Sequence, residues 1–197
     1  MLQRPCAEDM RADGERNRAA ILTAARRLFA ERGLGVPFDL IASQAGVSRA
    51  TQNRHFPTRE SLALALFEEN LNQLARVIKD SPVGEGYVAA LVLCAELMHR
   101  DIGFIELFDS REVGEQARSD IAARFLALME QPLRAAQAGG CVRGDLEPED
   151  TRMLVNMLGA AAIPNDLDPS DSSRGKRGTA LLVEAIQRPG KQVLPPP

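Results

Sequence analysis

The stretch "AGVSRATQNRHFPTRESL", residues 45–62, carries the clearest structural pattern in the chain. Gly46 lies in a tight turn, and Ser48 is a favoured N-cap residue for a short helix that runs to about His55. Pro57 ends that helix, and another helix follows. Two short helices joined by a glycine turn, behind an earlier helix, form the pattern of a helix-turn-helix.

The outer side of the short helix carries polar and cationic residues with no acidic residue among them: Arg49, Gln52, Asn53 and Arg54. A recognition helix in the DNA major groove needs such a face, because its outer side must be polar and must not be acidic. The preceding helices supply the apolar support. One is expected over about residues 15–32, and a second opens at Pro37, with Asp39 in its first turn.

Helical patterns continue to the end of the chain, and strand signals are absent. We expect an all-α protein of about nine helices, with a flexible arm at residues 1–14, a helix-turn-helix domain at 15–57 and a helical effector-binding and dimerisation domain at 58–197. The helix over 58–78 links the two domains. The later helices are expected at 87–100, 101–109, 112–138 (with a kink at Pro132), 148–163 and 174–188.

The charge distribution agrees with a DNA-binding front. The chain has a net charge of −3, but residues 1–60 carry ten arginines and seven acidic residues, a net of +3, while residues 61–197 carry a net of −6. A basic end and an acidic rear suit a molecule that presents one end to a polyanion. The absence of an apolar leader and of an apolar run of about 18 residues predicts a cytoplasmic protein without a membrane partner.

The stretch "ILTAARRLFAERGLGVPFDLIASQAGVSRATQNRHFPTRESLALALFEE" resembles the DNA-binding region of TetR-family transcriptional regulators. The resemblance rests on Ala24-Ala25 with Leu28-Phe29, Ile41-Ala42, Ala45-Gly46-Val47-Ser48 and Arg54-His55-Phe56-Pro57. It implies double-stranded operator DNA as partner, a homodimer and no cofactor. One departure stands out. Gln52-Asn53 replaces the family's usual Leu-Tyr, so Gln52 either points outward or places an amide at the rim of the core.

Side-chain chemistry predicts the roles at the DNA. Arg49 suits guanine O6/N7, and Gln52 or Asn53 suits adenine N6/N7. Ser48, Thr51, His55 and Arg59 are suited to phosphate contacts. Arg16 and Arg18, near the start of the first helix, are further candidates for contacts with the DNA backbone. The predicted DNA-binding residues are Ser48, Arg49, Thr51, Gln52, Asn53, Arg54, His55 and Arg59.

The family resemblance also implies a pocket for a small, largely apolar effector between the helices after residue 58. Its expected lining is Phe67, Leu71, Tyr87, Leu91, Cys94, Met98, Phe104, Phe108, Phe125 and Met129. The same residue types also build an ordinary core. The helix over 58–78 is the expected coupling element between effector and DNA.

The last two helices carry apolar stripes with no later element to cover them. Packing of these stripes against a second copy predicts a four-helix dimer interface formed by Met153, Leu154, Met157, Leu158, Ala161, Leu181, Leu182, Ala185 and Ile186. The alternative is that these helices cover their own domain.

The sequence supports a catalytic or metal-binding function less well than a DNA-binding one. His99 with Glu96 offers two ligands at most, and Cys6, Cys94 and Cys141 form no CxxC pair. The carboxylates Asp101, Glu106 and Asp109 lack a nucleophile or a phosphate loop nearby. We therefore expect a ligand-responsive transcriptional repressor rather than an enzyme. Two alternatives stay open: a helical interaction protein without specific DNA readout, and a small-molecule enzyme that uses the rear pocket.

Overall fold

The computed structural model describes residues 7–33, 35–100, 113–162 and 173–187. These residues form eight α-helices and no strand, which confirms the all-α prediction. The predicted helix at 101–109 lies outside the described residues. No helix in the described part is long and apolar enough to cross a membrane. The helices are α1 (Ala7–Arg32), α2 (Phe38–Gln44), α3 (Arg49–His55), α4 (Arg59–Asp80), α5 (Gly86–Arg100), α7 (Glu115–Ala138), α8 (Pro148–Ala162) and α9 (Ser173–Gln187).

The chain divides into two compact units. The first comprises residues 1–66 with 101–114, and the second comprises residues 67–100 with 115–197. Helix α4 begins in the first unit and ends in the second.

Helix α1 begins at Ala7, earlier than the expected start near Glu15, so residues 7–14 are helical where an arm is expected. An interior glycine costs a helix about 1 kcal/mol, and Gly14 is the reason for the later predicted start. The flanking alanine, acidic and basic residues are good helix formers, and Arg16 forms an ion pair with Asp13 one turn earlier.

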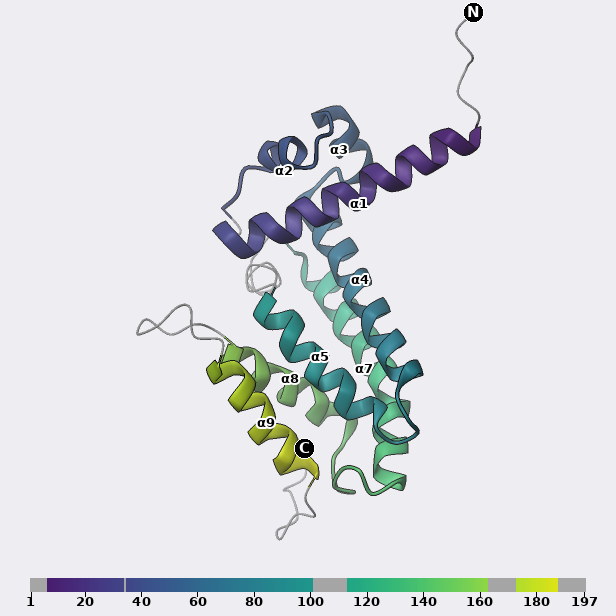
Figure 1. Ribbon diagram of the computed structural model, residues 1–197, viewed down its shortest axis with the longest axis vertical. Coiled ribbons are helices and arrows are strands. Elements are labelled where there is room, and N and C mark those ends of the chain that lie inside the picture. Colours follow the sequence, from purple (N-terminus) through teal and green to yellow (C-terminus); the bar gives the residue numbers. More distant parts are fainter. Residues whose placement is uncertain (1–6, 34, 101–112, 163–172, 188–197) are drawn as a thin grey trace, which may run out of the picture. The chain divides into compact units, whose positions relative to one another are not determined.

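The first unit has a small aliphatic core with two phenylalanines. Helices α1, α2 and α3 pack on one another pairwise (Figure 1). Each contributes one apolar face, as the spacing of the apolar residues predicts. The buried apolar side chains are Ile21, Leu22, Ala24, Ala25, Leu28, Phe29, Val36, Ile41, Ala42, Phe56, Leu62, Ala63, Ala65, Leu66 and Val113.

The second unit has the larger core. Helix α5 packs against α7, α8 and α9, and α8 also packs against α7 and α9 (Figure 1). Tyr87 and Leu91 of α5 are fully buried at the centre of this cluster. The hydroxyl of Tyr87 forms a 3.0 Å hydrogen bond with the hydroxyl of Thr151 on α8. Pro132 lies inside α7 and is buried, and the helix continues through it.

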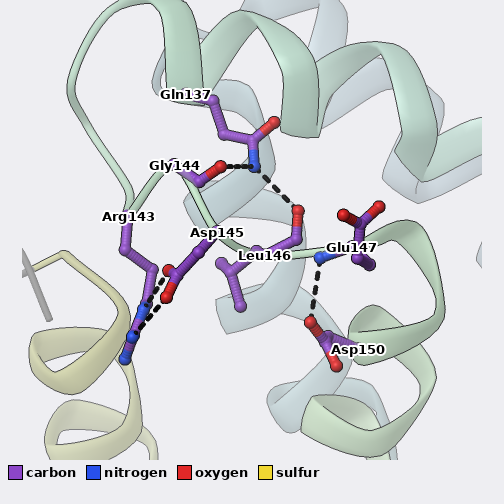
Figure 2. A network of polar contacts seen from close by, with 7 residues as sticks. All are labelled: Gln137, Arg143, Gly144, Asp145, Leu146, Glu147 and Asp150. Atoms are coloured by element: carbon purple, nitrogen blue, oxygen red, sulfur yellow. Dashed lines mark hydrogen bonds and ion pairs between the residues drawn. The ribbon is translucent and has the colours of Figure 1, made fainter. Parts of the chain in front are cut away.

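The loop between α7 and α8 is held by its own polar groups (Figure 2). Both Nε and Nη2 of Arg143 bind the carboxylate of Asp145, at 2.5 and 2.7 Å. The side-chain amide of Gln137 donates to the carbonyl oxygen of Leu146 at 2.8 Å, and Asp150 accepts a 2.9 Å bond from the backbone N–H of Glu147. The backbone N–H of Arg143 donates to a carbonyl of α9. These bonds fix the start of α8 and its neighbour α9.

Candidate nucleic-acid interface

Helix α3 begins with the predicted cap. The backbone of Ser48 is extended, and its Oγ accepts a 3.0 Å hydrogen bond from the backbone N–H of Thr51. Gly46 in the preceding turn has a φ of 68°, a left-handed conformation that glycine adopts without a steric penalty. The helix ends at His55, and Phe56 after it is buried in the core of the unit. The turn and the cap thus place α3 as the sequence predicts.

Gln52, one of the predicted DNA-binding residues, is buried. The side chain is 1% exposed, so it does not reach a base edge, and the prediction that it binds DNA is wrong. Its Nε2 donates a 3.0 Å hydrogen bond to the carbonyl oxygen of Phe38, while its Oε1 is buried without a hydrogen-bond partner. Gln52 lies on the side of α3 that packs against α2, where the family usually has leucine. An unpaired buried acceptor costs on the order of 1–3 kcal/mol.

The opposite side of α3 is open to solvent. The side chain of Arg49 is 72% exposed, and Asn53 and Arg54 are exposed as well. Helix α3 has no acidic residue in its first turn and has Arg54 and His55 in its last turn. Nη1 of Arg49 forms a 3.0 Å ion pair with Asp39 of α2, which the sequence pattern did not indicate. The residues suited to bases and phosphates are thus presented together on one helix.

The remaining predicted contacts are partly engaged within the unit. Thr51 and His55 are half-buried, and the Ser48 and Thr51 hydroxyls are 2.9 Å apart. Arg59 is half-buried, donates to the carbonyl oxygen of Val36 and lies over the ring of Phe38 at 5.9 Å. Arg59 therefore contacts both Val36, which precedes α2, and Phe38, the first residue of α2.

Arginines of α1 also flank this region. The guanidinium of Arg18 lies 5.4 Å from the centre of the Phe56 ring, in the geometry of a cation–π contact. The ring of His55 is tilted against the same phenylalanine. The sequence suggests Arg18 as a backbone contact, but its position over Phe56 follows only from the fold.

Five of the residues predicted for an effector pocket lie in the core of the second unit, and two more pack against it. Cys94 is among them, and burial raises the pKa of its thiol to about 12. Phe104 and Phe108 lie outside the described residues. Met98 is half-buried, Phe67 and Phe125 pack against the core, and the residues inside it are Leu71, Tyr87, Leu91, Cys94 and Met129.

Two hollows on the second unit lie elsewhere. One, of about 390 Å³, is lined by Ser81, Glu85, Val88, Ala89, Cys141 and Gln187. The other, of about 380 Å³, is lined by Gln137, Gly140, Val142, Arg143, Gly144, Asp145 and Gln187. Neither is lined by a residue predicted for the pocket. Within the described ranges, no three His, Cys, Asp or Glu side chains gather in a way that would hold a metal ion.

Some residues of the predicted dimer interface are buried within their own unit, and others are exposed. Leu154, Leu158 and Ile186 are buried in the core of their own unit, so they are not available to a second copy, and this part of the prediction is wrong. The reason is that α8 and α9 cover α5, which is apolar on most sides. Leu182 packs partly against the same core, and the side chain of Ala161 lies outside the described residues. The exposed members are Met153 (54%), Met157 (51%), Leu181 (57%) and Ala185.

A helix-turn-helix with an exposed cationic recognition helix defines a DNA-binding regulator. The family described as "Bacterial regulatory proteins, tetR family" matches residues 21–66, and the chain belongs to the TetR family of transcriptional regulators. No curated protein matches the sequence.

Solved structures support this assignment along most of the chain. The TetR transcription regulatory protein from Mycobacterium vanbaalenii is 30% identical, with 90% of this chain and 98% of that chain covered and a TM-score of 0.63. The TetR transcriptional regulator SCO0520 from Streptomyces coelicolor is 25% identical, with 87% and 98% covered and a TM-score of 0.64. AibR, in complex with isovaleryl coenzyme A and operator DNA, is 18% identical, with 88% and 100% covered and a TM-score of 0.62, and shares the fold.

Proposed function

We propose that this protein is a ligand-responsive transcriptional repressor that binds a pseudo-palindromic operator as a homodimer. The observation that carries the proposal is the outer side of α3, where Arg49, Asn53 and Arg54 are exposed together and no acidic residue of the helix accompanies them. That surface matches the major groove in shape and charge.

The proposal assigns distinct roles to these residues. Arg49 reads guanine through its guanidinium fork, and Asn53 pairs with adenine N6/N7. Ser48, Thr51, Arg54 and His55 contact phosphates and set the register, and the half-buried Arg59 also contacts a phosphate. Gln52 is excluded because it is buried.

The proposed dimer uses the exposed part of α8 and α9. Met153 and Met157 lie one turn apart on α8, and Leu181 lies on α9, which packs beside it. More than half of each of these side chains is exposed, and exposed apolar side chains that gather on neighbouring helices mark interaction surfaces. TetR-family regulators act as dimers, and two recognition helices about 34–36 Å apart match adjacent turns of DNA.

The proposed effector is a small, largely apolar molecule bound by the second unit, and the packed core around Leu91 would have to open to admit it. AibR, which shares the fold, was solved with both isovaleryl coenzyme A and operator DNA, and this supports effector binding in general but not the apolar character of the effector. An effector that binds one conformation more tightly shifts the population, and DNA must weaken effector binding by the same factor. We propose α4 as the coupling element, since its residues belong to both units. The proposal places the protein in the cytoplasm and assigns it no catalytic step.

The test is a binding titration of the purified protein against the DNA that flanks its own gene. Scrambled DNA of the same length is the control, and the titration is repeated at two salt concentrations. Sequence reading predicts a specificity ratio of roughly 10³ or more that persists as total affinity falls with salt. Equal binding of flanking, scrambled and other genomic DNA, with the same salt dependence, contradicts specific readout.

A further inference from the structure

The ion pair between Asp39 and Arg49 joins the two helices of the helix-turn-helix. Oδ2 of Asp39, in the first turn of α2, lies 3.0 Å from Nη1 of Arg49, the first residue of α3. Both side chains remain exposed, at 58% for Asp39 and 72% for Arg49. A carboxylate is therefore held on the surface beside the arginine to which the proposed function assigns a guanine.

This carboxylate is in an unfavourable place for general DNA affinity. A negative charge near the DNA surface is repelled by phosphates and lowers the affinity for every sequence. A positive charge at the N-terminus of α3 is also unfavourable, because the helix dipole is positive there and the first turn has no acidic residue. Asp39 offsets the second effect, because its carboxylate lies beside the guanidinium of Arg49.

The form of the contact leaves Arg49 able to read a base. The ion pair joins Nη1 to Asp39, and among the described residues the structure shows no hydrogen bond from Nε or Nη2 of Arg49. The pair Arg143–Asp145 differs, because there Nε and Nη2 both bind one carboxylate. In Arg49 the edge formed by Nε and Nη2 keeps the two donors that bidentate recognition of guanine requires.

A second contact holds the same part of α3. The carbonyl oxygen of Phe38, the residue before Asp39, accepts the hydrogen bond from Gln52, one turn after Arg49. The first turn of α2 therefore holds α3 at two points on adjacent turns. A guanidinium held in place loses less conformational freedom on binding than a free one.

We propose that Asp39 is a positioning residue that directs the fork of Arg49 towards guanine and so determines base preference at one position of each operator half-site. This inference rests on the proposed function, since it requires that Arg49 reads DNA. Asp39 itself touches no base.

The test selects random-sequence duplex DNA with the wild-type chain and with Asp39→Asn, and compares the preference at each base position. We expect wild-type discrimination of about tenfold for guanine at the Arg49 position, and about twofold in Asp39→Asn. Preferences at the other positions stay unchanged, and binding to scrambled DNA rises about two- to threefold. The Asp39→Asn change has no effect on preference in an Arg49→Ala background.

Glu31→Gln is the matched control. It also removes one negative charge and breaks an exposed pair, between Glu31 and Arg27 of α1 at 2.7 Å. We expect it to leave every base preference unchanged, and we expect both variants to keep the thermal midpoint of the wild type, because exposed pairs add little stability.

Three results contradict the inference. Guanine preference that survives Asp39→Asn, but not Arg49→Ala, means that Arg49 reads DNA without Asp39. If Asp39→Asn instead loses a preference for cytosine at another position, the carboxylate of Asp39 itself accepts a hydrogen bond from the amino group of that base. A wild-type chain that selects no sequence overturns the proposed function, and the inference with it.

Discussion

The two compact units differ in how they pair buried polar side chains. In the first unit, Gln52 is buried with one amide atom bonded to a backbone carbonyl and the other without a partner. In the second unit, Tyr87 and Thr151 are equally buried, and their hydroxyls bond to each other. The unpaired oxygen of Gln52 therefore destabilises the first unit at α3, whereas the bonded hydroxyls of Tyr87 and Thr151 carry no such cost in the second unit.

The arginines show the same contrast. Arg143 in the second unit is bound at two nitrogens by Asp145 and helps to close a loop. Arg49 in the first unit is bound at one nitrogen by Asp39 and stays largely exposed. Arg143 thus stabilises a loop of its own unit, whereas Arg49 keeps donors that are exposed to solvent.

Leu91→Ala is expected to have the largest effect. Leu91 is fully buried in the core of the second unit, and its truncation removes packing and leaves a cavity. We predict a loss of about 3 kcal/mol in the free energy of unfolding, measured by urea denaturation. Val88→Ala, at a partly buried position of the same helix, is the control and should cost less. A loss below about 1 kcal/mol for Leu91→Ala would mean that Leu91 lines a hollow pocket and does not lie in a packed core.

Tyr87→Phe tests the paired hydroxyls. The change leaves the buried hydroxyl of Thr151 without its partner, and we predict a loss of about 1–2 kcal/mol in the free energy of unfolding. Adding Thr151→Val removes the orphaned group, so the double variant should recover part of that loss. Strictly additive losses in the two single variants would show that the two hydroxyls are not coupled.

Gln52→Leu tests the unpaired amide in the first unit. Leucine has a similar volume and no orphaned acceptor, and the Phe38 carbonyl keeps its bond within α2. We predict a gain of about 1 kcal/mol in the opening free energy of α1–α3 amides, measured by native-state hydrogen exchange. Gln52→Ala is the control and should be destabilising. If Gln52→Leu lowers protection, the bond from Gln52 to Phe38 outweighs the cost of the orphaned oxygen.

Glu68→Gln is expected to have the smallest effect. Arg124 of α7 donates hydrogen bonds to Glu68 of α4 and lowers the pKa of that carboxyl below its ordinary value. A lowered folded-state pKa contributes stability above the unfolded-state pKa, and this contribution is lost as pH falls through the folded-state pKa. The stability difference between wild type and Glu68→Gln should therefore shrink below about pH 4.5 in urea titrations. A difference that is constant from pH 7 to pH 3 would contradict this role.

The sequence predicts the helices better than it predicts the surfaces. Periodicity, Ser48 as a cap and the flanking prolines locate α2, α3 and α8 closely, because these signals are local. The start of α1 is missed because Gly14 is a weak breaker when good helix formers surround it.

Which face of a helix is covered is a tertiary property. Gln52 is polar and lies beside exposed residues in sequence, yet it is buried against α2. Leu154 and Leu158 belong to the same apolar stripe as Met153 and Met157, yet only the methionines are exposed. The pair Asp39–Arg49 joins two helices, and no pattern within either helix reveals it.

The most direct test of the account compares the specificity ratio of the wild-type chain with that of Arg49→Ala/Asn53→Ala, on flanking and scrambled DNA at one salt concentration. Arg76→Ala, at an exposed position of α4 in the second unit, is the control. We predict that the wild-type ratio of roughly 10³ falls at least about a hundredfold in the double variant and is kept in the control. A ratio that the double variant retains would show that α3 does not read the operator through its exposed face.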